Sequence, residues 1–352
     1  MARSKIAKEQ VSALLAHLGT SGTVIAPHAK GQKSFTFQEM SDPTRVVLDY
    51  PRTLVPPKKY FLPPKETLLT FDLTANDYAR PDLVATPRIF VGLHSYDMQG
   101  LLRLDHAFSR GVPEANYLKR RENCRFVGVS YQPDEYHFAS SVGIPVHATE
   151  GFDLYLSEVE GGYLLEVLTE AGAQLVTGFD QLEPLAEAEL PAEPKSPGRL
   201  RIHYHRLPDL FARAYESAVW AEVSRRCTGC GSCNLVCPTC YCFDVRDDVA
   251  VDAKGGERVR LWDACMAEPF AEVAGGENFR HHLSSRQRHR LYRKFKYQSV
   301  GTEILYCIGC GRCSSQCTAG IVLTEIVNAI YEEQYGGDAL RRVAYPSSEV
   351  SP

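Results

Sequence analysis

The chain has 352 residues, of which 44% are hydrophobic and 23% charged, as in a globular protein with one large core or two smaller ones. Its formal net charge of −4 gives no overall reason to expect nucleic acid or an acidic membrane surface as a partner. No stretch approaches the roughly 20 apolar residues of a bilayer-spanning helix. We therefore expect no nucleic acid partner and no transmembrane segment.

Residues 1–22 carry several basic side chains, but His17 interrupts their apolar part and no small-residue cleavage site follows. This pattern favours a short amphipathic helix over an export signal. A chain that is not exported stays in the reducing cytoplasm, where disulfides are rare. We therefore expect a cytoplasmic protein.

The predicted fold class is α+β, and its first part is a β-rich α/β domain over residues 1–195. Short apolar runs at 88–97 and 124–132 are typical of buried strands, and the segment between them has helical spacing. Two alternating strands flank Gly161 and Gly162, which predicts a hairpin. Together these signals indicate strands and helices in alternation.

The composition changes after this region. Residues 183–199 are rich in Pro, Ala and Glu, which predicts a linker. Within a linker and connecting helix over 196–226, one amphipathic helix is predicted from the spacing of Leu210, Phe211, Tyr215, Val219 and Val223. A helical ferredoxin-type domain is expected over 227–335, with a helix ending at the glycine pair Gly336 and Gly337, and residues 336–352 form a C-terminal tail.

Eleven of the twelve cysteines lie after residue 226, and eight of them form an internal repeat. The blocks "CTGCGSCNLVCP", from Cys227, and "CIGCGRCSSQCT", from Cys307, align without a gap and share the spacing C-x2-C-x2-C-x3-C. Glycines between the cysteines let each loop fold closely around a cluster and point N–H groups at sulfur. This spacing is typical of two [4Fe–4S] clusters, in which the fourth cysteine of each block ligates the other cluster.

With this crossover, the predicted ligands are Cys227, Cys230, Cys233 and Cys317 for one cluster, and Cys307, Cys310, Cys313 and Cys237 for the other. Zinc is an alternative, but a zinc site favours two separated cysteine pairs. A disulfide framework is a weaker one in a reducing compartment. Because the segment between the blocks is long, we expect a helical frame with a hairpin around Gly255 and Gly256.

Four cysteines lie outside the repeat. Cys240, Cys242 and Cys265 are interpreted as small polarizable residues that pack near a cluster. The alternative is that they ligate metal, and a third cluster would then need a ligand from elsewhere. Cys124 stands beside strand-like residues, and we expect a buried core thiol there.

Residues 278–298 hold seven Arg and Lys and three His without an acidic residue. The simplest interpretation is a solvated helix face, with His281, His282 and His289 at the surface. A docking surface for an acidic partner is an alternative. A basic helix beside negatively charged clusters would also have an internal electrostatic role.

The first half shows no nucleotide-binding glycine motif, Walker loop or nucleophile elbow. His94 and Asp97 follow a predicted strand, where sites of α/β proteins often lie. One alternative is therefore an enzyme subunit whose own substrate site lies near His94, Asp97 or Asp153 and is supplied by the clusters.

Several stretches resemble one known family: the iron–sulfur (beta) subunits of cytosolic sulfhydrogenases and the A subunits of anaerobic sulfite reductases. They are "PPKKYFLPPKETLLTFDL", "GFDLYLSEVEGGYLLEVLTEAG", "CTGCGSCNLVCPTCYCFDV", "RLWDACMAEPFAEVAGGENFR", "RLYRKFKY" and "CIGCGRCSSQC". Together they extend from about residue 50 to residue 320.

The resemblance implies a non-catalytic electron-transfer subunit of an oxidoreductase complex of anaerobic metabolism. It further implies a hetero-oligomer in which this chain lies between a flavin- and NAD(P)-binding subunit and a catalytic metal subunit of the hydrogenase or reductase type. Members of the family often carry cysteines in the first half, one of them in an "RPCD"-like turn. Here that turn reads "LHSYD", and "VSYQPDEYHFASSVG" follows without a cysteine, so we expect no first-half cluster.

Overall fold

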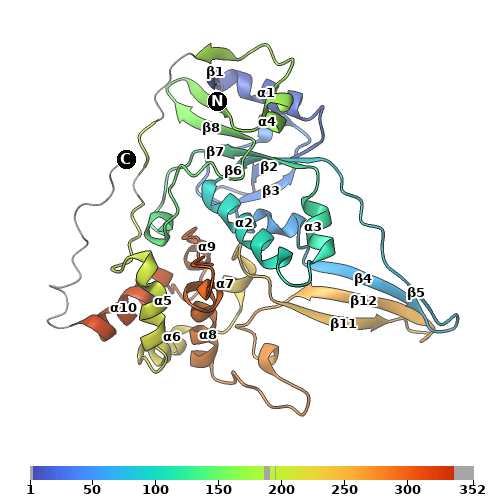
Figure 1. The fold of residues 1–352 in the computed structure, drawn as a ribbon, viewed down its shortest axis with the longest axis vertical. Coiled ribbons are helices and arrows are strands. Elements are labelled where there is room, and N and C mark those ends of the chain that lie inside the picture. The colour runs from blue at the N-terminus through green and yellow to red at the C-terminus, as the bar shows by residue number, and fades with distance from the viewer. Residues whose placement is uncertain (1–2, 186–190, 195, 337–352) are drawn as a thin grey trace. The chain divides into compact units, whose positions relative to one another are not determined.

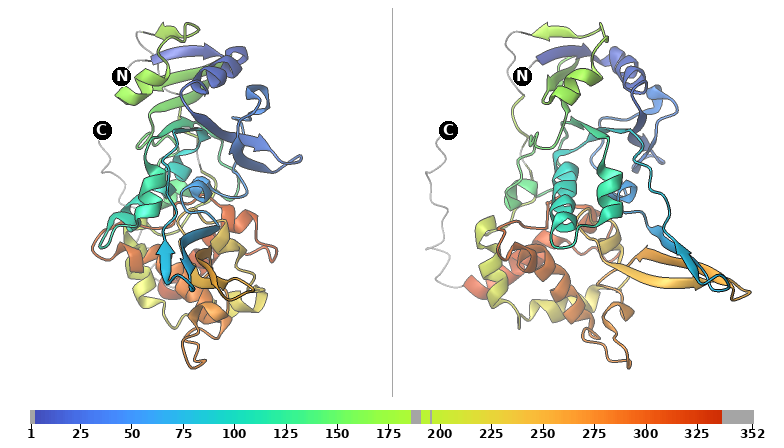
Figure 2. Two further views of the ribbon diagram at one scale, coloured as in Figure 1. Left: turned by 90° about the vertical axis from the view of Figure 1, so that its right-hand side faces the viewer. Right: turned by 45° about the vertical axis from the view of Figure 1, so that its right-hand side comes forward.

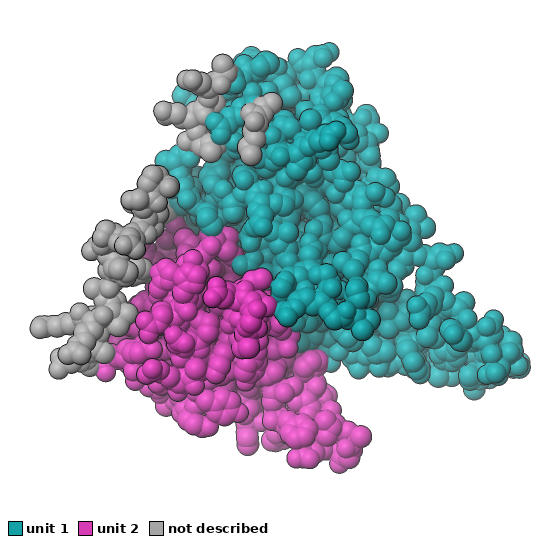
Figure 3. Space-filling view, viewed as in Figure 1, with its two compact units in different colours: residues 1–133, 145–195, 235–263 teal, residues 134–144, 196–234, 264–352 magenta. Residues whose placement is uncertain are grey.

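A computed structural model describes the chain except residues 1–2, 186–190, 195 and 337–352. The predicted tail beyond Gly336 and part of the predicted linker therefore lie outside the described residues. The chain divides into two compact units (Figure 3). Unit 1 comprises residues 1–133, 145–195 and 235–263, and unit 2 comprises residues 134–144, 196–234 and 264–352. Each unit thus combines segments that are distant in the sequence.

Unit 1 is built on an eight-stranded sheet with the strand order β10-β1-β9-β8-β7-β6-β2-β3 (Figure 1). Its four central strands β8, β7, β6 and β2 are parallel to one another, and all other pairs in the sheet are antiparallel. The strands are β1 (Arg3–Ala7), β2 (Thr23–Ala29), β3 (Phe35–Glu39), β6 (Arg88–Leu93), β7 (Cys124–Val129), β8 (Leu154–Val159), β9 (Gly162–Val167) and β10 (Glu183–Leu185). The predicted hairpin at Gly161 and Gly162 is confirmed by β8 and β9.

Both faces of this sheet are buried, because its central strands are apolar at successive positions. On β6, Ile89 and Val91 belong to a core cluster with residues of α1 (Val11–Leu18) and α4 (Glu170–Leu175). Phe90 points to the opposite face, where it joins a cluster with residues of α2 (Ser95–Ser109) and α3 (Ala115–Arg121). The expected α/β character of the first half is thereby confirmed. Figure 2 shows α2 and α3 side by side on one face.

The prediction of a helix over residues 1–22 was wrong in its first part. Arg3–Ala7 forms β1, which pairs with β9 and places Ile6 opposite Tyr163, fully buried. Sheet pairing outweighs the local helical pattern here because it buries Ile6 and gives this segment hydrogen-bonded neighbours on both sides, β9 and β10. Similarly, Glu183–Leu185 at the start of the predicted linker adds β10 to β1.

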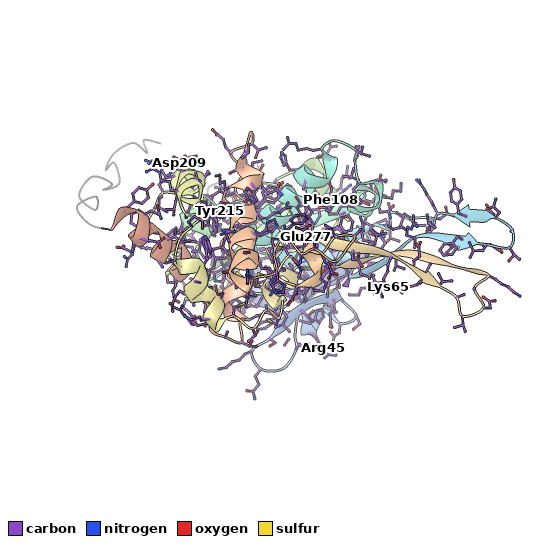
Figure 4. The ribbon with its side chains drawn as sticks, turned by 90° about the horizontal axis from the view of Figure 1, so that it is seen from below. Arg45, Lys65, Phe108, Asp209, Tyr215 and Glu277 are labelled. Atoms are coloured by element: carbon purple, nitrogen blue, oxygen red, sulfur yellow. The ribbon has the colours of Figure 1, made fainter. Side chains whose placement is uncertain are left out.

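A second sheet of unit 1 has the order β11-β12-β4-β5. Its strands are β4 (Lys65–Asp72), β5 (Asp77–Ala79), β11 (Phe243–Val249) and β12 (Gly255–Trp262). The last two form the predicted hairpin, which follows the first cysteine block and pairs through β12 with β4 of the first half. Figure 4 shows Lys65 on this sheet, where its ammonium pairs with Asp248 of β11 at 3.1 Å.

Unit 2 is helical, and packing joins α5 (Leu207–Arg213), α6 (Val219–Arg226), α8 (Leu283–Phe295) and α10 (Leu323–Tyr335). The predicted single helix through Leu210 and Val223 was wrong, because residues 214–218 interrupt it. At the break, Ala214 accepts a hydrogen bond from Trp220 Nε1 at 2.7 Å, and Tyr215 is exposed. The predicted helix near the C-terminus is confirmed as α10.

Short elements complete the description. Two single-turn helices, α7 (Ser232–Leu235) and α9 (Arg312–Ser315), lie inside the cysteine blocks. The 3-10 turns are Lys8–Gln10, Pro43–Arg45, Pro57–Tyr60, Ala139–Val142, Tyr204–Arg206, Pro269–Ala271 and Tyr297–Ser299. In the part of the chain that the structure describes, no helix has the length and apolarity needed to cross a membrane.

Candidate metal centre

The two cysteine blocks have the same backbone shape. Gly229 and Gly231 have φ values of +72° and +72°, and Gly309 and Gly311 have +66° and +72°. Each pair is followed by a single helical turn, α7 or α9. L-residues rarely adopt positive φ, so the glycines fix both loops in this conformation. The sequence repeat is thus also a structural repeat.

Thiols from both blocks line one hollow in unit 2. The hollow encloses about 500 Å³ of space, part of it open to solvent. The cysteines that line it are Cys227, Cys230, Cys233, Cys313 and Cys317. Apolar side chains, including Met266, Ile321, Leu323 and Ile326, cover much of the remaining wall. The hollow therefore joins three thiols of the first block to the fourth cysteine of the second.

Polar hydrogens point at the sulfur atoms of the first block. Gln287 Nε2 lies 3.0 Å from Cys227 Sγ, and the Gly229 N–H is directed at the same sulfur, with the nitrogen 3.4 Å away. Cys230 Sγ and Ser232 Oγ are 3.4 Å apart. Contacts of this kind stabilise thiolate charge and cluster-bound sulfur.

The surroundings shift the pKa values of two of these thiols in opposite directions. Hydrogen bonding from Ser232 lowers the pKa of the exposed Cys230. Burial raises the pKa of Cys233 to about 11, although Arg290 opposes that change. A metal ligand must be deprotonated, so Cys233 needs cationic iron beside it to become a thiolate. This donor set fits an iron–sulfur cluster.

The basic helix α8 is not a solvated face, contrary to the simplest interpretation of its sequence. Arg286, Arg290 and Lys294, spaced four residues apart, are 8%, 5% and 5% exposed. Arg286 Nη1 donates to the Met266 carbonyl at 3.3 Å, and Arg290 lines the hollow. The spacing places the three cations on one side of α8. This side faces inward because the long apolar stems of Arg and Lys gain from burial. His289, expected at the surface, is half-buried, whereas His281 and His282 are exposed.

The second block is more deeply enclosed than the first. Cys310 is buried, whereas Cys230 at the matching position is exposed. Phe138 donates its N–H to the Gly309 carbonyl at 2.9 Å, and Gly311 lies against Tyr136. Both contacts belong to the segment 134–144 of unit 2. Cys237 belongs to unit 1, where its sulfur lies 3.4 Å from Thr239 Oγ1.

The other cysteines lie in different surroundings. Cys265 is buried beside Asn234, whose Nδ2 donates to its sulfur at 3.2 Å. Lys58, itself buried and over the Trp262 ring, donates to the Cys240 carbonyl at 2.7 Å. Cys242 is half-buried and Cys124 is buried, and burial raises the pKa of Cys124. Among the described residues, no three His, Cys, Asp or Glu side chains, those of the hollow included, are grouped closely enough to hold a single metal ion.

The side chains considered for a first-half substrate site have structural contacts. His94 is fully buried and stacks between Tyr50 and Tyr131, with ring centroids 4.2 Å and 4.7 Å away. Asp97, in the first turn of α2, is also fully buried. The Asp153 carboxylate accepts hydrogen bonds from the Phe126 N–H at 2.9 Å and Thr169 Oγ1 at 2.7 Å. These contacts fix the loops around the large sheet.

Sequence reasoning did not identify Gln287 and Met266 as residues of the hollow. A glutamine in a basic helix carries no metal-ligand signal, and its contact with Cys227 spans 60 residues. Arg290 stands out in the sequence only as part of a basic stretch. The four-residue spacing of Arg286, Arg290 and Lys294 is the one signal that these three cations share a helix face.

Comparison with known proteins agrees with this site. A family model described as a 4Fe-4S dicluster domain matches residues 226–321. Sulfhydrogenase 2 subunit beta from Pyrococcus furiosus is 33% identical over 318 residues, which is 88% of this chain and 93% of that protein. No solved structure matches. The chain carries a C-terminal 4Fe–4S domain, and the interpretation as an iron–sulfur electron-transfer protein is confirmed over the zinc and disulfide alternatives. On these grounds the chain belongs to the family of sulfhydrogenase beta subunits.

Proposed function

We propose that this chain relays single electrons through two [4Fe–4S] clusters within a hetero-oligomeric oxidoreductase. Cys227, Cys230, Cys233 and Cys317 would hold one cluster, and Cys307, Cys310, Cys313 and Cys237 the other. When bound, each cluster alternates between two states that differ by one electron. The observation that carries the proposal is the shared hollow, which Cys317 lines together with the first three cysteines.

Crossed ligation accounts for a fifth thiol at this hollow. Cys313 is a ligand of the second cluster in our proposal, yet it lines the same space as the first-block cysteines. Two clusters that share neighbouring ligands lie near one another, as a relay requires. Cys237 is assigned to the second cluster from the repeat alone.

The neighbouring subunits would supply and consume the electrons. The name of the relative, a sulfhydrogenase subunit, favours a complex with other subunits. We infer that one of these binds flavin and NAD(P), and that another carries a catalytic metal. A reduced flavin would release its two electrons one at a time, give up its protons to water and so be reoxidised, while the catalytic subunit would accept both electrons in succession. Flow in the opposite direction balances in the same way.

Metal analysis of anaerobically purified protein tests the proposal. We expect about eight irons and about eight acid-labile sulfides per chain. Cys317→Ser should lose one cluster and retain the other, whereas Cys124→Ser, which changes a buried core thiol outside the repeat, should retain both. A count near four in the wild type, or full iron content in Cys317→Ser, would contradict the ligand assignment. A count near twelve would show a third cluster.

A further inference from the structure

One side of α8 supplies two polar groups to the first-block hollow. Gln287 and Arg290, one helical turn apart, both line it. They are 4% and 5% exposed, so little solvent screens them. Gln287 Nε2 approaches Cys227 Sγ to 3.0 Å, a distance suited to an N–H···S hydrogen bond.

The amide of Gln287 is only partly satisfied. Its Oε1 atom is buried without a hydrogen-bond partner among the residues that the structure describes. Leaving a buried acceptor without a hydrogen bond costs about 1–3 kcal/mol of folding free energy. An apolar side chain of the same size would avoid this cost, so stability alone does not explain a glutamine here. Its remaining polar contact is with the sulfur of Cys227.

We propose that Gln287 and Arg290 raise the reduction potential of the cluster held by Cys227, Cys230, Cys233 and Cys317. The inference rests on the function proposed above. Reduction adds one negative charge to a centre that already carries four thiolates. An N–H dipole at sulfur and a buried guanidinium both stabilise the more negative state more than the less negative one.

A redox titration of the complete chain, followed by electron paramagnetic resonance, measures this effect. The variant Gln287→Met keeps a similar volume but has no N–H to donate. We expect one of the two clusters to become harder to reduce, with the ratio of reduced to oxidised cluster falling about tenfold at fixed potential, which is 59 mV for one electron. The midpoint of the other cluster should stay unchanged.

Arg290 is tested by the same titration, with a control that removes the same charge elsewhere on α8. Arg290→Leu should lower the reduction potential of the same cluster, whereas Arg290→Lys should keep most of the wild-type value. Arg288→Leu removes an identical charge from the same helix, but the Arg288 guanidinium lies over the Tyr215 ring, 3.8 Å from its centroid. This control should leave both midpoints in place. If Gln287→Met fails to assemble clusters, Gln287→Leu, which also has no N–H to donate, provides the same readout.

The results separate this inference from the proposed function. Wild-type protein without iron would overturn both. Variants that retain both clusters with unchanged midpoints would overturn only the role of Gln287 and Arg290. Equal shifts of both clusters, or a shift in Arg288→Leu as large as that in Arg290→Leu, would also overturn it, because either result indicates a general effect of net charge.

Discussion

Glu66 of β4 accepts a hydrogen bond at 3.0 Å from Nε of Arg260 on β12, 194 residues further along the chain. Arg120 Nη2 reaches the other carboxylate oxygen at 2.5 Å, and Asn116 Nδ2 does so at 2.8 Å. Arg260 Nη1 also donates to Glu114 at 3.0 Å. This buried network fixes the hairpin that follows the first cysteine block to the first half of the chain. Of the segment between the blocks, the part up to residue 263 belongs to unit 1, and the part from residue 264 belongs to unit 2.

Glu66→Gln should strongly destabilise the protein. It leaves two guanidinium groups beside a neutral amide, and breaking a buried ion pair costs about 3–5 kcal/mol. Although burial raises the pKa of Glu66, the two arginines lower it overall, so the carboxylate is charged at neutral pH. Urea unfolding followed by circular dichroism measures the loss. Asp247→Asn removes an exposed ion pair with Arg258 in the same sheet, so its loss of stability should be far smaller. Similar losses in both variants would contradict this role of Glu66.

His289 should make the protein less stable in mild acid. Burial, together with the positive charges of Arg280 and Arg293, lowers its pKa to about 4. In the unfolded chain the imidazole binds a proton near pH 6.5, so between about pH 6.5 and 4 the unfolded state holds more protons. The free energy of unfolding therefore falls as the pH falls through this window. His289→Gln should reduce that slope.

Measurement of unfolding free energy from pH 8 to pH 5 tests this expectation. Above about pH 7 the curves of the wild type and His289→Gln should run parallel, because the imidazole is neutral in both states there. Identical slopes throughout the acidic range would rule out the buried neutral histidine.

The repeated glycines should respond unequally to alanine. A Cβ at Gly309 would lie 2.4 Å from the Ala139 nitrogen, whereas at Gly229 its nearest neighbour, Leu283 Cδ1, is 3.6 Å away. Both changes impose a positive φ on alanine, at about 1–2 kcal/mol. Gly309→Ala also requires the 134–144 segment to move, so its unfolding midpoint on heating should fall further. Equal midpoints for the two variants would refute the close packing.

The cluster bound by the first block should react faster with a hydrophilic oxidant. Cys230 is exposed, whereas Cys310 at the equivalent position is buried. Cys313→Ser would leave the cluster held by Cys227, Cys230, Cys233 and Cys317, and Cys317→Ser would leave the other. Bleaching by ferricyanide, followed by visible absorption, should be faster in Cys313→Ser. The reverse order would mean that exposure of the loop does not govern access.

Local patterns in the sequence predicted those features that depend on a few neighbouring residues. Both cysteine loops require glycine at positive φ, and the hairpins at Gly161 and Gly255 follow from turn residues between alternating strands. The assignment of Arg3–Ala7 to a helix failed because a distant strand, β9, offered a better partner. The break between α5 and α6 escaped because residues 214–218 contain no proline or glycine.

Thiols that recur with cluster spacing can be recognised without a structure, since the reach of a short loop depends only on its own backbone. Which groups surround those thiols depends on long-range packing. The contact between Gln287 and Cys227 and the burial of Arg290 arise from the packing of α8 against α6. Such contacts join segments far apart in the chain. Whether the basic side of a helix faces water or sulfur depends on which surfaces the whole fold buries, and residue spacing within the helix does not encode this.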